Sequence, residues 1–209
     1  MRIAIIGTGN VGAAIARGLR GKGHLITLGA RSPLAPQVQT LAAGTGATAA
    51  LPADAARDAD IVVLALPWAA TESAVQALGD LSGRIVIDCT NPIGRTAHGM
   101  DLTLGHTTSG GETVQRWLPR AHVVKTLNQV GAEIMADTAR LPHPPVMFMA
   151  GNDAHAKAAV ARLLADLGFD ALDAGDITRA RLLEPLGMVW INQALMRGKG
   201  RHWAFAAIS

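Results

Sequence analysis

The sequence has few of the residues on which several enzyme classes depend. Its 209 residues include no tyrosine, which excludes the tyrosine–lysine acid catalyst of short-chain dehydrogenases. A single cysteine, Cys89, excludes an internal disulfide, and an unpaired thiol fits a reducing cytoplasm. We therefore expect a cytoplasmic protein held together by an apolar core, because 49% of its residues are hydrophobic.

Signals for membranes, metals and nucleic acids are also missing. No apolar run reaches the roughly eighteen residues that a membrane-spanning helix needs, and Met1 leads directly into an apolar run, so we expect neither a membrane segment nor a signal peptide. The seven histidines show neither His-x-His nor His-x-x-x-His spacing, and we expect no metal site. The dispersed basic residues and few aromatics argue against a nucleic-acid partner. Ser109 lies in Thr-Ser-Gly-Gly rather than a Gly-x-Ser-x-Gly elbow, so hydrolase chemistry has no support.

The first thirty-two residues contain the clearest functional pattern. Arg2 to Ile6 is a short apolar run with the β-branched content of a buried strand. A Gly-x-Gly-x-x-Gly turn follows and leads into an apolar helix; its residues are Gly7, Thr8, Gly9, Asn10, Val11 and Gly12. The first glycine permits a tight turn, the second lets a pyrophosphate approach the backbone, and the third lets helix and strand pack closely. The helix N-terminus then offers N–H groups to the anion, so the pattern predicts dinucleotide binding.

The absence of acidic residues before Asp54 indicates which dinucleotide binds. A second strand, Leu25 to Leu28, ends at Gly29-Ala30-Arg31-Ser32. An NAD site usually places Asp or Glu there to hold the ribose 2′-hydroxyl. A guanidinium and a hydroxyl suit a 2′-phosphate instead, so we predict NADP(H). The alternative is that Arg31 is a solvated turn residue.

Alternating strands and helices predict an α/β protein with a doubly wound, mainly parallel Rossmann-type sheet and a small C-terminal helical part. We expect one domain over residues 1–209, with an NADP-binding core at 1–140 and a strand–helix extension at 141–209 that completes the sheet and the substrate cleft. Strands are expected at residues 2–6, 25–28, 47–50, 61–66, 84–88, 123–126, 145–150 and 171–173. Residues 89–108 are expected to be irregular.

In such sheets, ligands bind outside the carboxyl ends of the strands. The residues that follow the fourth and fifth strands are expected to flank the nicotinamide; they are Leu66, Pro67, Trp68, Asn91 and Pro92. Trp68 either covers a flat ring or packs in the core. Asn91 and Asn128 either bind the carboxamide or a substrate, or close turns. The expected substrate-binding residues are Asn128, Val130 and Met188, where Met188 belongs either to the wall over a second ring or to the core.

Shorter patterns predict local contacts. Ser109 and Glu112 have the spacing of a capping box for a helix that ends near Trp117. Arg181 and Glu184 lie three residues apart on the last helix and are expected to form a local ion pair. The basic tail at residues 197–203 is either a frayed terminus or a clamp for an anion.

Several segments together resemble the NADP oxidoreductases that depend on coenzyme F420, an 8-hydroxy-5-deazaflavin. They are Gly7 to Gly12, Gly29 to Ser32, Leu66 to Trp68, Asp173 to Gly175 and Arg181 to Glu184, and the resemblance runs from Met1 to the final helices. It implies a homodimer and direct hydride transfer between nicotinamide and a stacked deazaflavin, with no catalytic acid or base. It places the phosphate turn at Thr8 to Val11, the 2′-phosphate at Arg31 and Ser32, and Pro67 near the nicotinamide.

One departure leaves the second substrate open. Some family members have His after the sixth strand, where this chain has Asn128. The chain is also similar to reductase domains of membrane metalloreductases and to bacterial proteins that use a flavin, a quinone or a small carbonyl compound. Lys125 with Asn128 is similar to the Lys and Asn of β-hydroxyacid dehydrogenases, one residue short of their spacing. An NADPH-dependent carbonyl or imine reductase with Lys125 as proton donor is therefore an alternative, as is a non-catalytic NADP(H)-sensing module.

Overall fold

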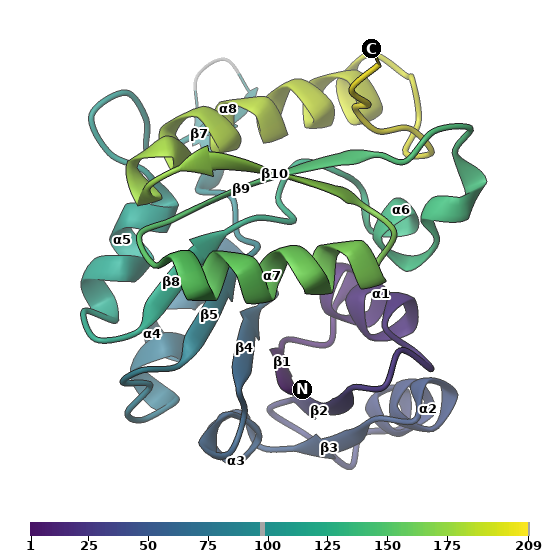
Figure 1. The fold of residues 1–209 in the computed structure, drawn as a ribbon, viewed down its shortest axis with the longest axis vertical. Helices are drawn as coiled ribbons and strands as arrows, with labels where there is room; N and C mark the ends of the chain where they lie inside the picture. Colours follow the sequence, from purple (N-terminus) through teal and green to yellow (C-terminus); the bar gives the residue numbers. More distant parts are fainter. Residues whose placement is uncertain (97–98, 209) are drawn as a thin grey trace.

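The structure, a computed structural model, describes residues 1–96 and 99–208. Its main feature is an eight-stranded sheet with the strand order β10-β9-β8-β5-β4-β1-β2-β3 (Figure 1). These strands are β1 (Arg2–Ile6), β2 (Leu25–Gly29), β3 (Thr48–Ala50), β4 (Ile61–Leu64), β5 (Ile85–Asp88), β8 (His122–Lys125), β9 (Val146–Gly151) and β10 (Asp170–Gly175). The predicted α/β class and mainly parallel sheet are confirmed.

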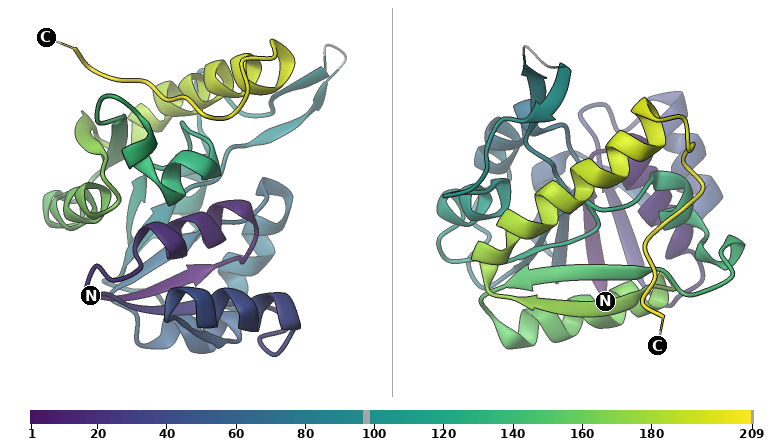
Figure 2. Two further views of the ribbon diagram at one scale, coloured as in Figure 1. Left: turned by 90° about the vertical axis from the view of Figure 1, so that its right-hand side faces the viewer. Right: turned by 90° about the horizontal axis from the view of Figure 1, so that it is seen from above.

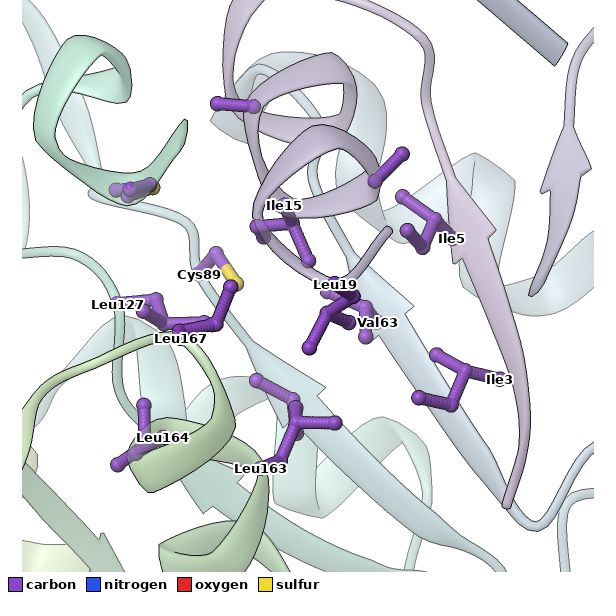
Figure 3. Close-up of a cluster of buried hydrophobic side chains, with 14 of the residues drawn as sticks. Ile3, Ile5, Ile15, Leu19, Val63, Cys89, Leu127, Leu163, Leu164 and Leu167 are labelled. Carbon is purple, nitrogen blue, oxygen red and sulfur yellow. The ribbon is translucent and has the colours of Figure 1, made fainter. Parts of the chain in front are cut away.

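Apolar residues alternate between the two faces of the sheet, because successive side chains of a strand point to opposite sides. In β1, Ile3 and Ile5 belong to one buried cluster, whereas Ala4 and Ile6 belong to another. Figure 3 shows the first cluster, in which side chains of β1 meet those of two helices, α1 (Asn10–Gly18) and α7 (Ala154–Asp166). The second cluster lies under α3 (Pro52–Arg57), α4 (Trp68–Ala77) and α5 (Gly110–Trp117). A further helix, α2 (Pro36–Thr45), covers the β3 end.

The last two strands run against the direction of the others. Val124 and Lys125 of β8 pair antiparallel with Gly151 and Ala150 of β9, and β10 is parallel to β9. The connection from β8 to β9 contains only the short elements α6 (Ala132–Ala136) and η1 (Thr138–Arg140). Because this connection does not bring the chain back to the edge of the sheet where β8 begins, β9 runs antiparallel to β8.

The segment expected to be irregular contains a hairpin. Strands β6 (Ile93–Thr96) and β7 (Gly99–Leu102) pair antiparallel and project from the body of the molecule (Figure 2). After β10, the chain forms η2 (Ile177–Arg179), α8 (Ala180–Ile191) and η3 (Asn192–Met196). Seen from above, α8 lies across the carboxyl ends of the central strands (Figure 2), which makes it the roof of any site at that edge.

The basic tail packs back onto the protein, so the expectation of a frayed terminus is wrong. The indole N–H of Trp190 donates to the Trp203 carbonyl at 2.9 Å, and the two rings stack at 5.9 Å. Arg201 forms an ion pair with Glu133 of α6 at 2.7 Å. Within residues 1–96 and 99–208, none of the helices has both the length and the hydropathy to cross a membrane.

Candidate functional site

Two glycines of the turn after β1 are required by the packing of the chain itself. Gly7 has φ = 105°, and a Cβ atom there would lie 2.3 Å from the Ala65 carbonyl oxygen. A Cβ atom on Gly12 would lie 1.9 Å from the carbonyl oxygen of Gly7. Both approaches are far inside van der Waals contact, so a larger side chain at either position would force the turn apart.

The middle glycine is not required in this way. Gly9 has an ordinary φ of −74°, and a Cβ atom added there would meet nothing within 4 Å. It precedes helix α1, whose first turn has no side-chain cap and no acidic residue. A cavity of about 380 Å³ begins at Thr8, Gly9 and Asn10 and continues along α1 to Arg17 and to Glu133 of α6. The turn therefore leaves room for a group from outside the chain, and the free helix N–H groups suit an anion such as a pyrophosphate.

The expected 2′-phosphate residues stand beside this turn. Gly29, the last residue of β2, accepts a hydrogen bond from the Gly7 amide at 3.1 Å, and Arg31 and Ser32 follow two and three residues later. Both are exposed. The Arg31 guanidinium has no hydrogen-bond or ion-pair partner among the residues that the structure describes. A charged donor next to an open anion site fits the extra phosphate of NADP(H).

The residues after β4 divide into two groups. Leu66 abuts the turn, because its Cδ2 atom lies 3.0 Å from the ideal Cβ position of Gly7, and Pro67 is exposed at the start of α4. Trp68 instead turns toward α5 and stacks on Trp117 at 5.5 Å with 23° between the rings. One face of Trp68 is therefore already covered.

Asn91 and Asn128 bind each other. The Asn91 side chain donates to the Asn128 carbonyl at 2.9 Å, and the Asn128 amide donates to Asn91 Oδ1 and to the Leu183 carbonyl, both at 3.0 Å. Asn128 Oδ1 accepts from Gln129 at 2.9 Å. Both amide hydrogens of Asn128 are thus used inside the protein, whereas Asn91 keeps one hydrogen for another acceptor.

The other expected residues differ in how far they are buried. Pro92 is buried next to Asn91, and its carbonyl accepts two hydrogen bonds from Thr103, at 2.7 Å and 2.9 Å. Val130 is buried two residues beyond Asn128, and Met188 is half-buried on α8. The Val11 side chain packs against the core, so only its backbone can serve the phosphate turn.

A buried charge cluster lies under α8, and the sequence analysis did not identify it. Lys125 at the end of β8 is fully buried, as are Asp88 at the end of β5 and Glu184 on α8. The ammonium group lies 3.0 Å from Asp88 Oδ2 and 3.0 Å from Glu184 Oε1, and also bonds the Thr90 carbonyl. The sequence offered one signal for this cluster. Asp88 and Lys125 end neighbouring strands, and Glu184 is an acidic residue in a mainly apolar helix.

The predicted Arg181–Glu184 ion pair is wrong. Glu184 accepts from the amides of Gly110 and Gly111 at 2.9 Å and 3.0 Å, where it caps helix α5. Arg181 reaches Glu112 of α5 instead. The two residues share a helix, but Glu184 points into the protein and Arg181 along its surface. The predicted cap is confirmed, since the Ser109 hydroxyl accepts from the Glu112 amide at 3.2 Å.

Lys125 stays charged without an exposed proton. Burial alone would lower its pKa, but the charges and hydrogen bonds of Asp88 and Glu184 outweigh burial and raise the pKa. Its three ammonium hydrogens match three acceptors: Asp88, Glu184 and the Thr90 carbonyl. A carbonyl or imine substrate therefore finds no free donor at Lys125. Among the described residues, no group of three or more His, Cys, Asp or Glu side chains could hold a metal ion.

Comparison with known proteins identifies the family. Residues 2–92 match the family described as NADP oxidoreductase, coenzyme F420-dependent. A crystal structure from Arthrobacter sp. FB24, of a protein provisionally named F420-dependent NADP-reductase, is 38% identical, with a TM-score of 0.89 and coverage of 100% of both chains. The chain belongs to the coenzyme F420-dependent NADP oxidoreductase family.

Other members and relatives agree with this placement. The F420-dependent NADP reductase of Methanocaldococcus jannaschii is 28% identical over 200 residues, which cover 89% of each chain. The metalloreductase STEAP3 of Rattus norvegicus is 25% identical over 187 residues, 88% of this chain but only 36% of that protein. The family consists of NADP(H)-dependent oxidoreductases, so the chain is an enzyme of that class, and its glycine turn and Arg31 fit the cofactor.

Proposed function

We propose that this member of the family transfers a hydride between NADP(H) and a deazaflavin, coenzyme F420, or a flavin-like acceptor. When bound, the nicotinamide supplies or accepts the hydride. The glycine turn would hold the pyrophosphate, Arg31 and Ser32 the 2′-phosphate, and Leu66, Pro67 and Asn91 the nicotinamide end. We further propose a cytoplasmic location, which the unpaired Cys89 supports.

The observation that carries this proposal is the state of the charged groups at the carboxyl edge. Asp88, Lys125 and Glu184 are brought there by β5, β8 and α8; all three are buried, and both carboxylates bind the Lys125 ammonium group. Reduction of a carbonyl leaves an alkoxide that must receive a proton as the hydride arrives, whereas a deazaflavin or flavin ring spreads the negative charge and can take its proton from solvent, so hydride exchange between two rings needs no proton from the protein. Catalysis would then come mainly from holding the two rings in contact in a dry cleft.

Stopped-flow mixing tests the proposal. The NADPH-loaded enzyme is mixed with coenzyme F420, with FMN or with a panel of small carbonyl and imine compounds, and NADPH absorbance is followed. We expect rapid oxidation by the deazaflavin or by FMN. Turnover of carbonyl or imine compounds alone would support the Lys125 alternative, and tight NADPH binding without turnover of any acceptor would support a sensing module. Either result refutes the proposal.

We also propose that the enzyme is a homodimer that uses the outer face of α8. Leu182, Pro185 and Val189 are spaced along one side of the helix, and Leu182 and Val189 are 62% and 50% exposed. Sedimentation velocity should show a dimer at micromolar concentration. Val189→Arg should give a monomer, whereas Leu34→Arg, at a position 86% exposed elsewhere, should not. A monomeric wild type would contradict the proposal.

A further inference from the structure

Helix α8 contacts the carboxyl edge of the sheet through three positions on one side. The Leu183 carbonyl accepts from Asn128, and the Glu184 carboxylate meets Lys125, both at 3.0 Å. At Gly187 the helix backbone is so close that a Cβ atom would lie 2.7 Å from the Asn128 carbonyl oxygen. We call Leu183, Glu184 and Gly187 the α8 joint.

Position 184 of the joint suits a glutamate better than a glutamine or an aspartate. Glu184 Oε2 accepts from the Gly110 amide, while Oε1 accepts from the Gly111 amide and faces the Lys125 ammonium. All three partners are donors. A glutamine would turn its own N–H₂ group toward at least one of them, and an aspartate would be one methylene too short. The carboxylate also lies at the N-terminus of α5, where the helix dipole favours a negative charge.

The joint adjoins the residues proposed to hold the reacting rings. Asp88 precedes Asn91 by three residues, Lys125 precedes Asn128 by three, and Glu184 precedes Met188 by four. A Cβ atom on Gly187 would also lie 3.1 Å from Asn91 Oδ1. A displacement of α8 would therefore move the acceptor wall and the Asn91 amide together. The glycine turn joins β1 to α1 and packs against the two residues after β4, Ala65 and Leu66, and it shares no residue with the joint.

We propose that Glu184 is a positioning residue that sets the height of α8 over the carboxyl edge and so shapes the acceptor side of the cleft. It acts through Lys125, Asn91 and Met188 and does not touch the reacting atoms. The inference rests on the proposed function, since it assumes that an acceptor lies between Met188 and the nicotinamide.

The test separates acceptor binding from NADPH binding. In Glu184→Gln we expect the KM for coenzyme F420 to rise about tenfold or more, because a displaced α8 removes contacts of the acceptor wall and each tenfold change in affinity corresponds to only about 1.4 kcal/mol. The NADPH Kd, measured by calorimetry, should rise much less, because the glycine turn and Arg31 are untouched and only Asn91 at the nicotinamide end is displaced. Glu112→Gln is the matched control: it removes the other carboxylate that links α5 to α8, outside the buried cluster, and should leave both values within twofold. An unchanged acceptor KM in Glu184→Gln, or an equal rise in the NADPH Kd, would overturn the proposal.

Gly187→Ala distinguishes position from charge. It removes no charge and no hydrogen-bonding group, but its methyl group must push α8 away from Asn128. We expect the same rise in acceptor KM with a much smaller rise in the NADPH Kd. If Gly187→Ala kept the wild-type acceptor KM while Glu184→Gln raised it, the Glu184 charge would act without moving α8, and the positioning role would be wrong.

Hydrogen exchange keeps the inference testable if the proposed function fails. If wild-type enzyme oxidises NADPH with none of the acceptors, the function is refuted but the joint can still be examined. Amide exchange in the NADP⁺ complex should then quicken at residues 89–91 and 187–191 in Glu184→Gln, relative to Glu112→Gln, while residues 7–13 keep the wild-type rate. Equal exchange in the two variants would contradict the positioning role.

Discussion

Arg31→Ala gives the sharpest test of cofactor choice, because its effect on binding should be separable from any effect on folding. The side chain is exposed and unpaired within the part of the chain that the structure describes, so its loss should change the free energy of unfolding by less than about 0.5 kcal/mol. A hydrogen bond to a charged group contributes roughly 1.5–3 kcal/mol. At about 1.4 kcal/mol for each tenfold change, the NADPH Kd should rise roughly ten- to 150-fold.

The assay compares two cofactors in two variants. Calorimetric titration of Arg31→Ala should show the loss for NADPH and almost no change for NADH, which lacks the 2′-phosphate. Arg20→Ala removes the same charge from an exposed position just after α1, and it should change the NADPH Kd by less than about twofold at physiological salt, where distant exposed charges are screened. Equal losses for both cofactors, or tighter NADH binding by wild type, would refute the assignment of Arg31.

Three further outcomes are expected. Gly9→Ala should leave the urea midpoint unchanged yet weaken NADPH binding at least tenfold, since its methyl group meets no protein atom and would meet only the bound pyrophosphate. Gly12→Ala should instead destabilise the fold, and equal losses of stability in the two variants would contradict this distinction. Lys125→Met should lower the free energy of unfolding by about 3–5 kcal/mol in urea titrations, because two buried carboxylates lose their cation, and a loss below about 1 kcal/mol would mean that water reaches them. The hydrogen bonds of Arg181 lower the pKa of Glu112, so the pair stabilises the fold at pH values above the ordinary carboxyl pKa, and this contribution is lost as the pH falls through the lowered pKa. The free energy of unfolding of wild type should exceed that of Glu112→Gln by roughly 1 kcal/mol at neutral pH, and the difference should disappear on acidification. A difference that does not change with pH would exclude the pair as its cause.

Features with a local cause were predictable from the sequence. The strand–turn–helix at Gly7 to Gly12 follows from glycine spacing beside an apolar run, and its steric reasons are visible at Gly7 and Gly12. The cap at Ser109 follows from a side chain that reaches the amide three residues away. Such contacts lie within one helical turn, so a sequence window contains both partners.

Features with a distant cause were not predictable in the same way. The direction of β9 depends on the path taken by the β8–β9 connection, and hydropathy does not encode strand direction. Glu184 has Arg181 at helical spacing, yet its partner Lys125 lies on a strand 59 residues earlier in the chain (184 − 125). The amide of Asn128 is saturated partly by Leu183, which no local pattern indicates. The amide hydrogens of Asn128 are therefore taken up inside the protein. The expected substrate-binding role of Val130 and Met188 stays a prediction.

The lone thiol of Cys89 lies one residue beyond Asp88 and two before Asn91. Burial, with the adjacent Asp88 charge, raises its pKa, so the reactive thiolate is scarce while the native packing holds. Modification by a disulfide reagent consequently requires the segment to open first. The rate of modification therefore reports how often the chain opens just after β5, at a sulfur in the buried core, and needs no engineered label.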